Sequence, residues 1–156
     1  MIPYGLYVLT AKAKDGRMAA SSISWVTQAS FEPPMIALAV KVESETYTIC
    51  KEAGELAVNF LSKDQKDVAS KFFKHQEPVG DSIDGEPLQQ GALGIPLLAN
   101  SSASLECKVI EIIEKGDHHI FLAEIINVEL RNQPEGRPDD SSLKVKDLGD
   151  KMFYGG

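Results

Sequence analysis

Side chains that can hydrogen-bond a polar ligand are concentrated between Met18 and Pro34, in a stretch that stops at Pro33-Pro34. Its hydroxyl and amide residues are Ser21, Ser22, Ser24, Thr27, Gln28 and Ser30. An apolar run follows at residues 35–42 and predicts a strand buried on both faces. Small donors beside a rigid strand suit a planar polar ligand that the backbone approaches closely. Alternatively, the serines form an ordinary loop and Trp25 is a core or dimer aromatic.

A second group of residues has the chemistry to hold a phosphate. Lys41 lies at the end of the predicted strand, and Ser44 and Thr46 stand where a short helix is expected to begin. A helix N-terminus offers unpaired N–H groups and a partial positive charge, to which a nearby lysine adds a full charge. The alternative is that Ser44 only caps the helix and that Lys41 is a solvated strand end.

The histidines and cysteines indicate no metal site. His118 and His119 are adjacent in a predicted strand, so their side chains point to opposite faces, and no ligand set completes a zinc site around them. Asp117 and His118 could bind a ligand edge, although such a pair more often only forms a turn. Cys50 and Cys107 lack metal or redox spacing and are expected to be buried, reduced thiols.

Length and charge limit the possible partners. The chain has 156 residues and a net charge of −7, which predicts one domain spanning residues 1–156 and argues against nucleic acid as a partner. A local pocket of donors can still hold an anionic cofactor. No apolar run approaches the ~20 residues of a membrane span, and the start lacks a signal-peptide layout, so we expect no membrane partner and a cytoplasmic location.

The elements that must position these residues are mostly strands linked by turns. Strands are expected at 4–10, 17–22, 35–42, 56–61, 103–114 and 119–131, with short helices at 45–53 and from 62 to about 75. Asp15-Gly16 marks a hairpin, and Ser62 and Gln65 form a capping box before an apolar helix face that includes Phe72 and Phe73. Residues 76–96 and 132–142 indicate irregular connections.

This order favours a mainly β protein. A closed antiparallel barrel or a sandwich with a few peripheral helices fits it better than a parallel sheet does. The chain has neither a Gly-x-Gly-x-x-Gly nor a Walker motif, so a Rossmann or P-loop fold has no support. It has no nucleophile elbow either, which argues against a hydrolase.

Five segments occur in an order that resembles the flavin reductase-like family. They are 5–11, 24–34, 56–61, 105–109 and Gly116-Asp-His118. The resemblance covers roughly residues 4–154 and is closest to the flavin reductase domain at the C-terminus of cyanobacterial flavodiiron (diflavin) proteins, here expected as a module standing alone. It implies an FMN-binding split β-barrel, Greek-key-like and antiparallel, that forms a homodimer with FMN bound non-covalently near the subunit interface.

The resemblance also implies roles for individual residues. The isoalloxazine ring would lie along Ala19, Ala20, Ser21 and Ser22. Contacts to the ring edge and the ribityl chain would come from Trp25, Val26, Thr27 and Gln28. The phosphate would be held by Ser30, Lys41, Ser44 and Thr46. His118 matches the histidine of the Gly-Asp-His motif and is the expected catalytic residue, beside flavin and nicotinamide.

The function that the resemblance implies is that of an NAD(P)H-dependent FMN reductase-like oxidoreductase. Hydride would pass from NADH or NADPH to flavin N5 and on to a small acceptor or a redox partner protein. The alternative is a flavoredoxin-like electron-transfer module that binds FMN but has no NAD(P)H site of its own. A third possibility is a barrel that binds no flavin and serves as a structural or regulatory subunit.

Overall fold

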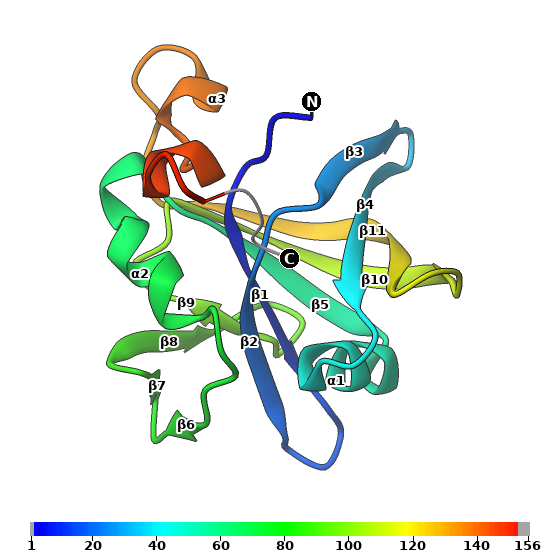
Figure 1. The fold of residues 1–156 in the computed structure, drawn as a ribbon. Coiled ribbons are helices and arrows are strands. Elements are labelled where there is room, and N and C mark those ends of the chain that lie inside the picture. The colour runs from blue at the N-terminus through cyan, green and yellow to red at the C-terminus, as the bar shows by residue number, and fades with distance from the viewer. Residues whose placement is uncertain (1, 153–156) are drawn as a thin grey trace.

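Seven antiparallel strands form the main sheet in the computed structural model, which describes residues 2–152 (Figure 1). In spatial order they are β2 (Met18–Ile23), β1 (Tyr7–Lys12), β5 (Glu55–Phe60), β10 (Ala103–Ile113), β11 (His118–Leu130), β4 (Pro34–Lys41) and β3 (Val26–Phe31). The predicted hairpin at Asp15-Gly16 joins β1 to β2, and Gly16 there adopts a φ of 95°. The mainly β, antiparallel fold is therefore confirmed.

The two edge strands of this sheet follow one another in the sequence. β2 ends at Ile23 and β3 begins at Val26, so Ser24 and Trp25 alone connect opposite edges of the sheet. The three peptide units between Ile23 and Val26 span at most about 10 Å. The sheet therefore has to curl until its edges meet at this link. The edges diverge on either side of it, which makes the barrel a split one (Figure 1).

The first helix, α1 (Glu45–Ala53), has the boundaries that the sequence predicts. The Ser44 hydroxyl accepts the Tyr47 N–H at 3.1 Å and caps its start. Gly54 ends the helix in the left-handed region, with a φ of 66°, where its N–H bonds to the Cys50 carbonyl. Packing of α1 against β1 and β2 fixes the position of its N-terminus.

The second helix is shorter than expected. The capping box at Ser62 and Gln65 is confirmed, but it opens a 3₁₀ turn (Lys63–Gln65) and only a short helix, α2 (Lys66–Lys71). Phe72 leaves helical geometry because its side chain is fully buried and its carbonyl accepts the Ser22 N–H, at 2.8 Å, on the free edge of β2. Phe73, expected on the apolar face, is 43% exposed.

A second small sheet occupies a region expected to be irregular, so that prediction was wrong. Its strands are β6 (Pro78–Val79), β7 (Ser82–Ile83), β8 (Glu86–Gln90) and β9 (Pro96–Leu98). Strands of two to five residues interrupted by Gly and Pro are too short to show an alternating pattern. Ile83 and Leu97 are nevertheless fully buried and anchor this sheet to the rest of the protein.

The inner strands carry apolar packing on both faces. Leu9, Leu56 and Val58 belong to a core cluster that also includes Phe121. Neighbouring residues on the opposite faces pack in a second cluster with α2 and the C-terminal segment, and it includes Leu6, Val8, Ala20, Phe72 and Leu143. Cys50 and Cys107 are buried and unpaired, as predicted.

Strand β4 is buried on one face only, whereas the sequence predicted burial on both. Ile36, Leu38 and Val40 are buried, but Met35 and Ala37, which alternate with them, are half-buried. The reason is that an antiparallel barrel wall turns one face to the core, and small apolar residues occupy the other face of β4.

The C-terminal segment packs back onto the barrel. After the expected connection at 132–142, which contains α3 (Pro138–Ser141), Leu143 and Val145 are buried and η2 (Val145–Leu148) follows. Within residues 2–152, no helix has the length and apolar character to cross a membrane. Tyr154, which ends the stretch of family resemblance, lies outside the described residues.

Candidate functional site

The two-residue link between β2 and β3 places the side chains of Ser24 and Trp25 at the split of the barrel. Ser24 is 2% exposed, and its hydroxyl has no hydrogen-bond partner among the residues that the structure describes. The Trp25 carbonyl accepts the Ala39 N–H at 3.0 Å, which ties the link to β4. The Trp25 indole lies against the imidazole of His118, with ring centroids 4.5 Å apart.

His118 is held at this position by the turn before β11. Its Nδ1 lies 2.9 Å from Oδ1 of Asp117, and the Asp117 carbonyl accepts the N–H of Val42. The hydrogen bond from His118 is the main cause that lowers the pKa of the Asp117 carboxyl below its usual value. In the strand register, His118 stands directly opposite Lys41 of β4. The structure therefore brings His118, Trp25 and Lys41 together.

His119 faces the other side of the strand, as predicted for adjacent histidines. Its Nδ1 lies 2.8 Å from the hydroxyl of Tyr47, and the two rings meet edge to face. Tyr47 is 93% buried within α1, so this contact joins the helix to β11. His119 thus serves the fold, while His118 faces the split.

The predicted phosphate residues have different roles in the structure. The Ser44 hydroxyl donates to the Lys41 carbonyl at 2.7 Å and accepts the N–H of Tyr47, so Ser44 is the N-cap of α1. Thr46 is 2% exposed. The Lys41 side chain is half-exposed, and its ammonium lies 4.0 Å from the carboxylate of Glu43. The group most available to an anion here is therefore the Lys41 ammonium, beside the positive end of α1.

The β2 residues predicted along the flavin ring serve the core through their side chains. Ala19 and Ala20 are fully buried, in the two different core clusters. The Ser22 hydroxyl donates to the Ala69 carbonyl at 2.7 Å. Ser21 pairs with Leu9 and is half-buried. A ligand along this strand would therefore contact mainly backbone atoms, because most of the side chains are buried in the core or hydrogen-bonded within the protein.

The β3 residues lie along the opposite edge. Val26 packs on the core, whereas Thr27 and Gln28 are exposed. Ser30 pairs with Met35, six residues before Lys41 on β4, which corresponds to about 20 Å at ~3.3 Å per residue. The structure therefore does not bring Ser30 to the Lys41 end within one chain.

Sequence reasoning did not assign a role to Ser24, although it lies in the serine-rich stretch. Its burial without a partner becomes visible only when both barrel edges are in place. The structure also has a broad groove between the N-terminal and C-terminal segments, and Gln28 is the one predicted site residue that lines it. Ile2, Tyr4, Asn132 and Met152 are among its other lining residues.

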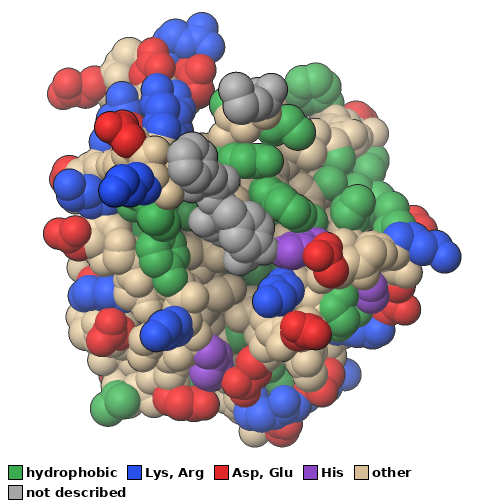
Figure 2. Space-filling model, viewed as in Figure 1, with side chains coloured by type: hydrophobic (Ala, Val, Ile, Leu, Met, Phe, Trp, Pro, Cys, Tyr) green, Lys and Arg blue, Asp and Glu red, His purple; other side chains and the backbone are tan. Residues whose placement is uncertain are grey.

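Exposed apolar side chains occur along three strands of the main sheet. Figure 2 shows hydrophobic groups over the side of the molecule where β3 and β4 lie. The exposed large residues of β3, β10 and β11 are Phe31, Ile110, Ile113, Ile120, Ile126, Val128 and Leu130. Patches of this kind mark interaction surfaces more often than single exposed residues do.

Comparison with known proteins identifies relatives across most of the chain. A family profile described as "Flavin reductase like domain" matches residues 1–143. "Diflavin flavoprotein A 1" of Synechocystis is 32% identical over 124 residues, which cover 79% of this chain and 22% of that protein. "Ferric-chelate reductase (NAD(P)H)" of Archaeoglobus fulgidus is 27% identical, with coverage of 86% and 80%.

Solved structures show the same fold. The NADH:FAD oxidoreductase SgcE6 of Streptomyces globisporus has a TM-score of 0.74 and 27% identity, covering 83% of this chain and 77% of that one. An FMN-binding protein from Thermus thermophilus has a TM-score of 0.74 at 22% identity, and this similarity supports only a shared fold. The chain spans less than half the length of several curated relatives that it matches.

Proposed function

Since this chain belongs to the flavin reductase-like family, we propose that it is an oxidoreductase that binds FMN non-covalently at the split of the barrel. Bound FMN would supply the redox chemistry, which is acceptance of hydride from NADH or NADPH and transfer of electrons to an acceptor. The protein's own residues would bind and orient the FMN and shield it from water. Two relatives, an NADH:FAD oxidoreductase and a ferric-chelate reductase, support this class of activity.

The observation that carries this proposal is the grouping of Trp25, His118 and Lys41. The two rings lie 4.5 Å apart, and Lys41 stands opposite His118 in the strand register. FMN has an aromatic ring at one end and a phosphate at the other. An aromatic pair beside a cation and a helix N-terminus offers a matching surface for each end.

The buried hydroxyl of Ser24 is consistent with a polar ligand at the split. An unsatisfied buried donor costs about 1–3 kcal/mol. The Ser24 hydroxyl has no hydrogen-bond partner among the described residues, and rotation about χ1 allows it to turn toward a ligand. A heteroatom on the flavin edge would remove this cost, so we assign Ser24 as an additional cofactor contact.

The phosphate is assigned to the Lys41 end of the site. Lys41 supplies the charge, and the N–H groups at the start of α1, near Ser44 and Thr46, supply dipoles. Ser30 is too far along β4 to share this phosphate in the same chain. His118 is proposed as the residue that orients nicotinamide against the ring, and Asp117 fixes its imidazole.

We also propose a homodimer formed through the exposed apolar side chains of β10 and β11. On β11 they are Ile120, Ile126, Val128 and Leu130, and the register of the strand is interrupted by a bulge at Ile126. Burial of these side chains in a symmetric contact would stabilise the dimer. Light scattering on Ile126→Glu and Val128→Glu variants is expected to show monomers, and unchanged dimers would rule out this contact.

The decisive experiment is a visible spectrum of purified protein reconstituted with FMN, before and after anaerobic NADH or NADPH. We expect a bound-flavin spectrum that bleaches with at least one nucleotide. A flavin spectrum that resists both would favour the electron-transfer module, and protein that stays colourless with FMN would overturn flavin binding altogether.

The His118→Ala variant distinguishes a role of His118 in flavin reduction from a role in FMN binding. It is expected to slow flavin reduction in stopped-flow measurements by about tenfold or more while FMN affinity changes less. Equal reduction rates in the variant and the parent would remove His118 from the reaction.

A further inference from the structure

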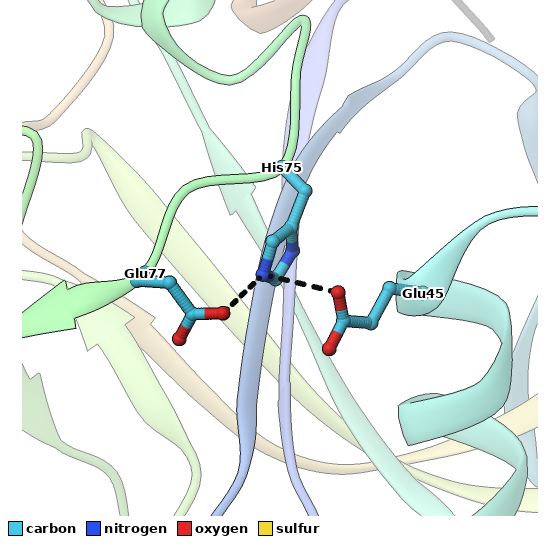
Figure 3. A group of neighbouring side chains, drawn as sticks. All are labelled: Glu45, His75 and Glu77. Carbon is cyan, nitrogen blue, oxygen red and sulfur yellow. Dashed lines mark hydrogen bonds and ion pairs between the residues drawn. The ribbon is translucent and has the colours of Figure 1, made fainter.

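Three side chains converge on one point beside the N-terminus of α1, next to the proposed phosphate end of the flavin site. Figure 3 shows Glu45 of α1 pointing toward His75 and Glu77, which come from the chain between α2 and β6. The Nε2 atom of His75 lies 3.3 Å from Oε2 of Glu45 and 3.2 Å from Oε1 of Glu77. One ligand atom from each residue lies within 4.8 Å of the other two.

The backbone holds these residues in place. Glu45 is the first residue of α1, directly after its cap. His75 and Glu77 flank Gln76, whose side-chain amide donates to the Lys71 carbonyl at 3.4 Å. This segment leaves α2 at the buried Phe72, which is bonded to the edge of β2. The cluster therefore bridges α1 and the chain between α2 and β6.

Hydrogen bonding alone satisfies this cluster poorly. A neutral imidazole with its hydrogen on Nε2 has one N–H to offer, yet two carboxylates compete for it. A doubly protonated ring would add an Nδ1–H, and Nδ1 is buried with no partner among residues 2–152. One imidazole nitrogen and two carboxylates are also a donor set that can coordinate a divalent cation.

The distances also suit a metal ion. Zinc bonds to nitrogen and oxygen ligands are about 2.0–2.1 Å, which places two ligands of a tetrahedral site about 3.3–3.4 Å apart. The two nitrogen–oxygen separations in the cluster, 3.3 and 3.2 Å, lie close to this value. The side chains of Glu45, His75 and Glu77 are 45%, 27% and 79% exposed, so an ion has access from solvent.

We propose that Glu45, His75 and Glu77 form a Zn²⁺ site that joins α1 to the segment before β6. His75 binds through Nε2 and each glutamate through one oxygen, which leaves a fourth position for water. An imidazole with two carboxylates selects Zn²⁺ or a similar transition metal over Mg²⁺, which prefers oxygen ligands. Because Nδ1 lacks a partner in the described chain, no second-shell hydrogen bond orients the imidazole, which lowers the affinity for the ion.

The test is calorimetric titration of Zn²⁺ into protein freed of metal with a chelator, with no flavin added. We expect one ion per chain and a rise in the midpoint of thermal unfolding with Zn²⁺. Co²⁺ in place of Zn²⁺ should give the visible bands of a tetrahedral site. Omission of flavin makes the result independent of the proposed reductase function.

Three variants identify the ligands. Glu45→Gln, His75→Gln and Glu77→Gln are each expected to weaken Zn²⁺ binding by about tenfold or more. Glu77 is 79% exposed, so its substitution leaves folding intact and keeps the test valid if another variant is unstable. Asp139→Asn, on α3 at the other end of the molecule (Figure 1), is the matched control and should bind Zn²⁺ like the parent. No binding to the parent, or equal binding by Glu77→Gln, would overturn the site.

Discussion

The imidazole of His118 and the indole of Trp25 lie with their ring centres 4.5 Å apart, although Trp25 lies between β2 and β3 and His118 begins β11, the last strand in the sequence. The contact exists because β11 and β4 are neighbours and the link that carries Trp25 is bonded to β4. Trp25 is the only tryptophan of the chain. Its fluorescence therefore reports directly on the candidate site.

The first prediction separates two residues assigned to the phosphate. Lys41→Ala should weaken FMN binding by about tenfold or more, because a hydrogen bond to a charged group contributes about 1.5–3 kcal/mol. Ser30→Ala is the matched control and should leave the affinity nearly unchanged, since Ser30 lies toward the other end of β4. Titration of FMN with Trp25 fluorescence as the signal gives both constants. Equal losses in the two variants would place the phosphate elsewhere.

The second prediction concerns pH. Because the pKa of Asp117 is lowered in the folded protein, its contact with His118 is present above the ordinary aspartate pKa and is lost as pH falls through the lowered value. Trp25 fluorescence should change across that acidic range while the far-ultraviolet circular dichroism stays constant. The transition should disappear in Asp117→Asn, and its persistence there would assign it to another group.

The third prediction concerns a buried polar residue of β5. The Asn59 amide donates to the Val8 carbonyl at 3.0 Å, and its oxygen accepts from the Leu98 N–H and the Ser104 hydroxyl. Asn59→Ala leaves these buried groups without a hydrogen-bond partner and should lower the free energy of unfolding by about 3 kcal/mol.

Urea denaturation measures this effect. The exposed Asn100 provides the control, because its replacement by alanine should change the free energy of unfolding by less than about 0.5 kcal/mol. A loss at Asn59 as small as the loss at Asn100 would mean that the network contributes little to stability.

The fourth prediction concerns the two thiols. Burial raises the pKa of Cys50 and of Cys107 to about 12, so both remain protonated at mildly alkaline pH. Iodoacetamide should modify neither in the folded protein and both in guanidinium chloride, as counted by mass spectrometry. Rapid labelling of the folded chain would show that the barrel opens locally at α1 or β10.

Local sequence signals determined several elements of this protein by themselves. Ser44 and Gly54 defined both ends of α1, since capping depends only on neighbouring residues. The long strands β10 and β11 and the Asp15-Gly16 hairpin were likewise predictable, because their patterns extend over many residues or form a known turn. The ordered family segments indicated the split barrel.

Tertiary structure alone decided which of the predicted site residues meet. The strand register sets His118 opposite Lys41 and leaves Ser30 far along β4, a relation that no local pattern encodes. The short strands β6 to β9 and the early end of α2 depend on burial of residues such as Ile83 and Phe72 against distant parts of the chain. The cluster around His75 arises in the same way, because Glu45 belongs to a different segment. Contacts between segments far apart in sequence form only when the whole barrel closes. The sequence therefore identified these residues as candidates but could not show which of them become neighbours.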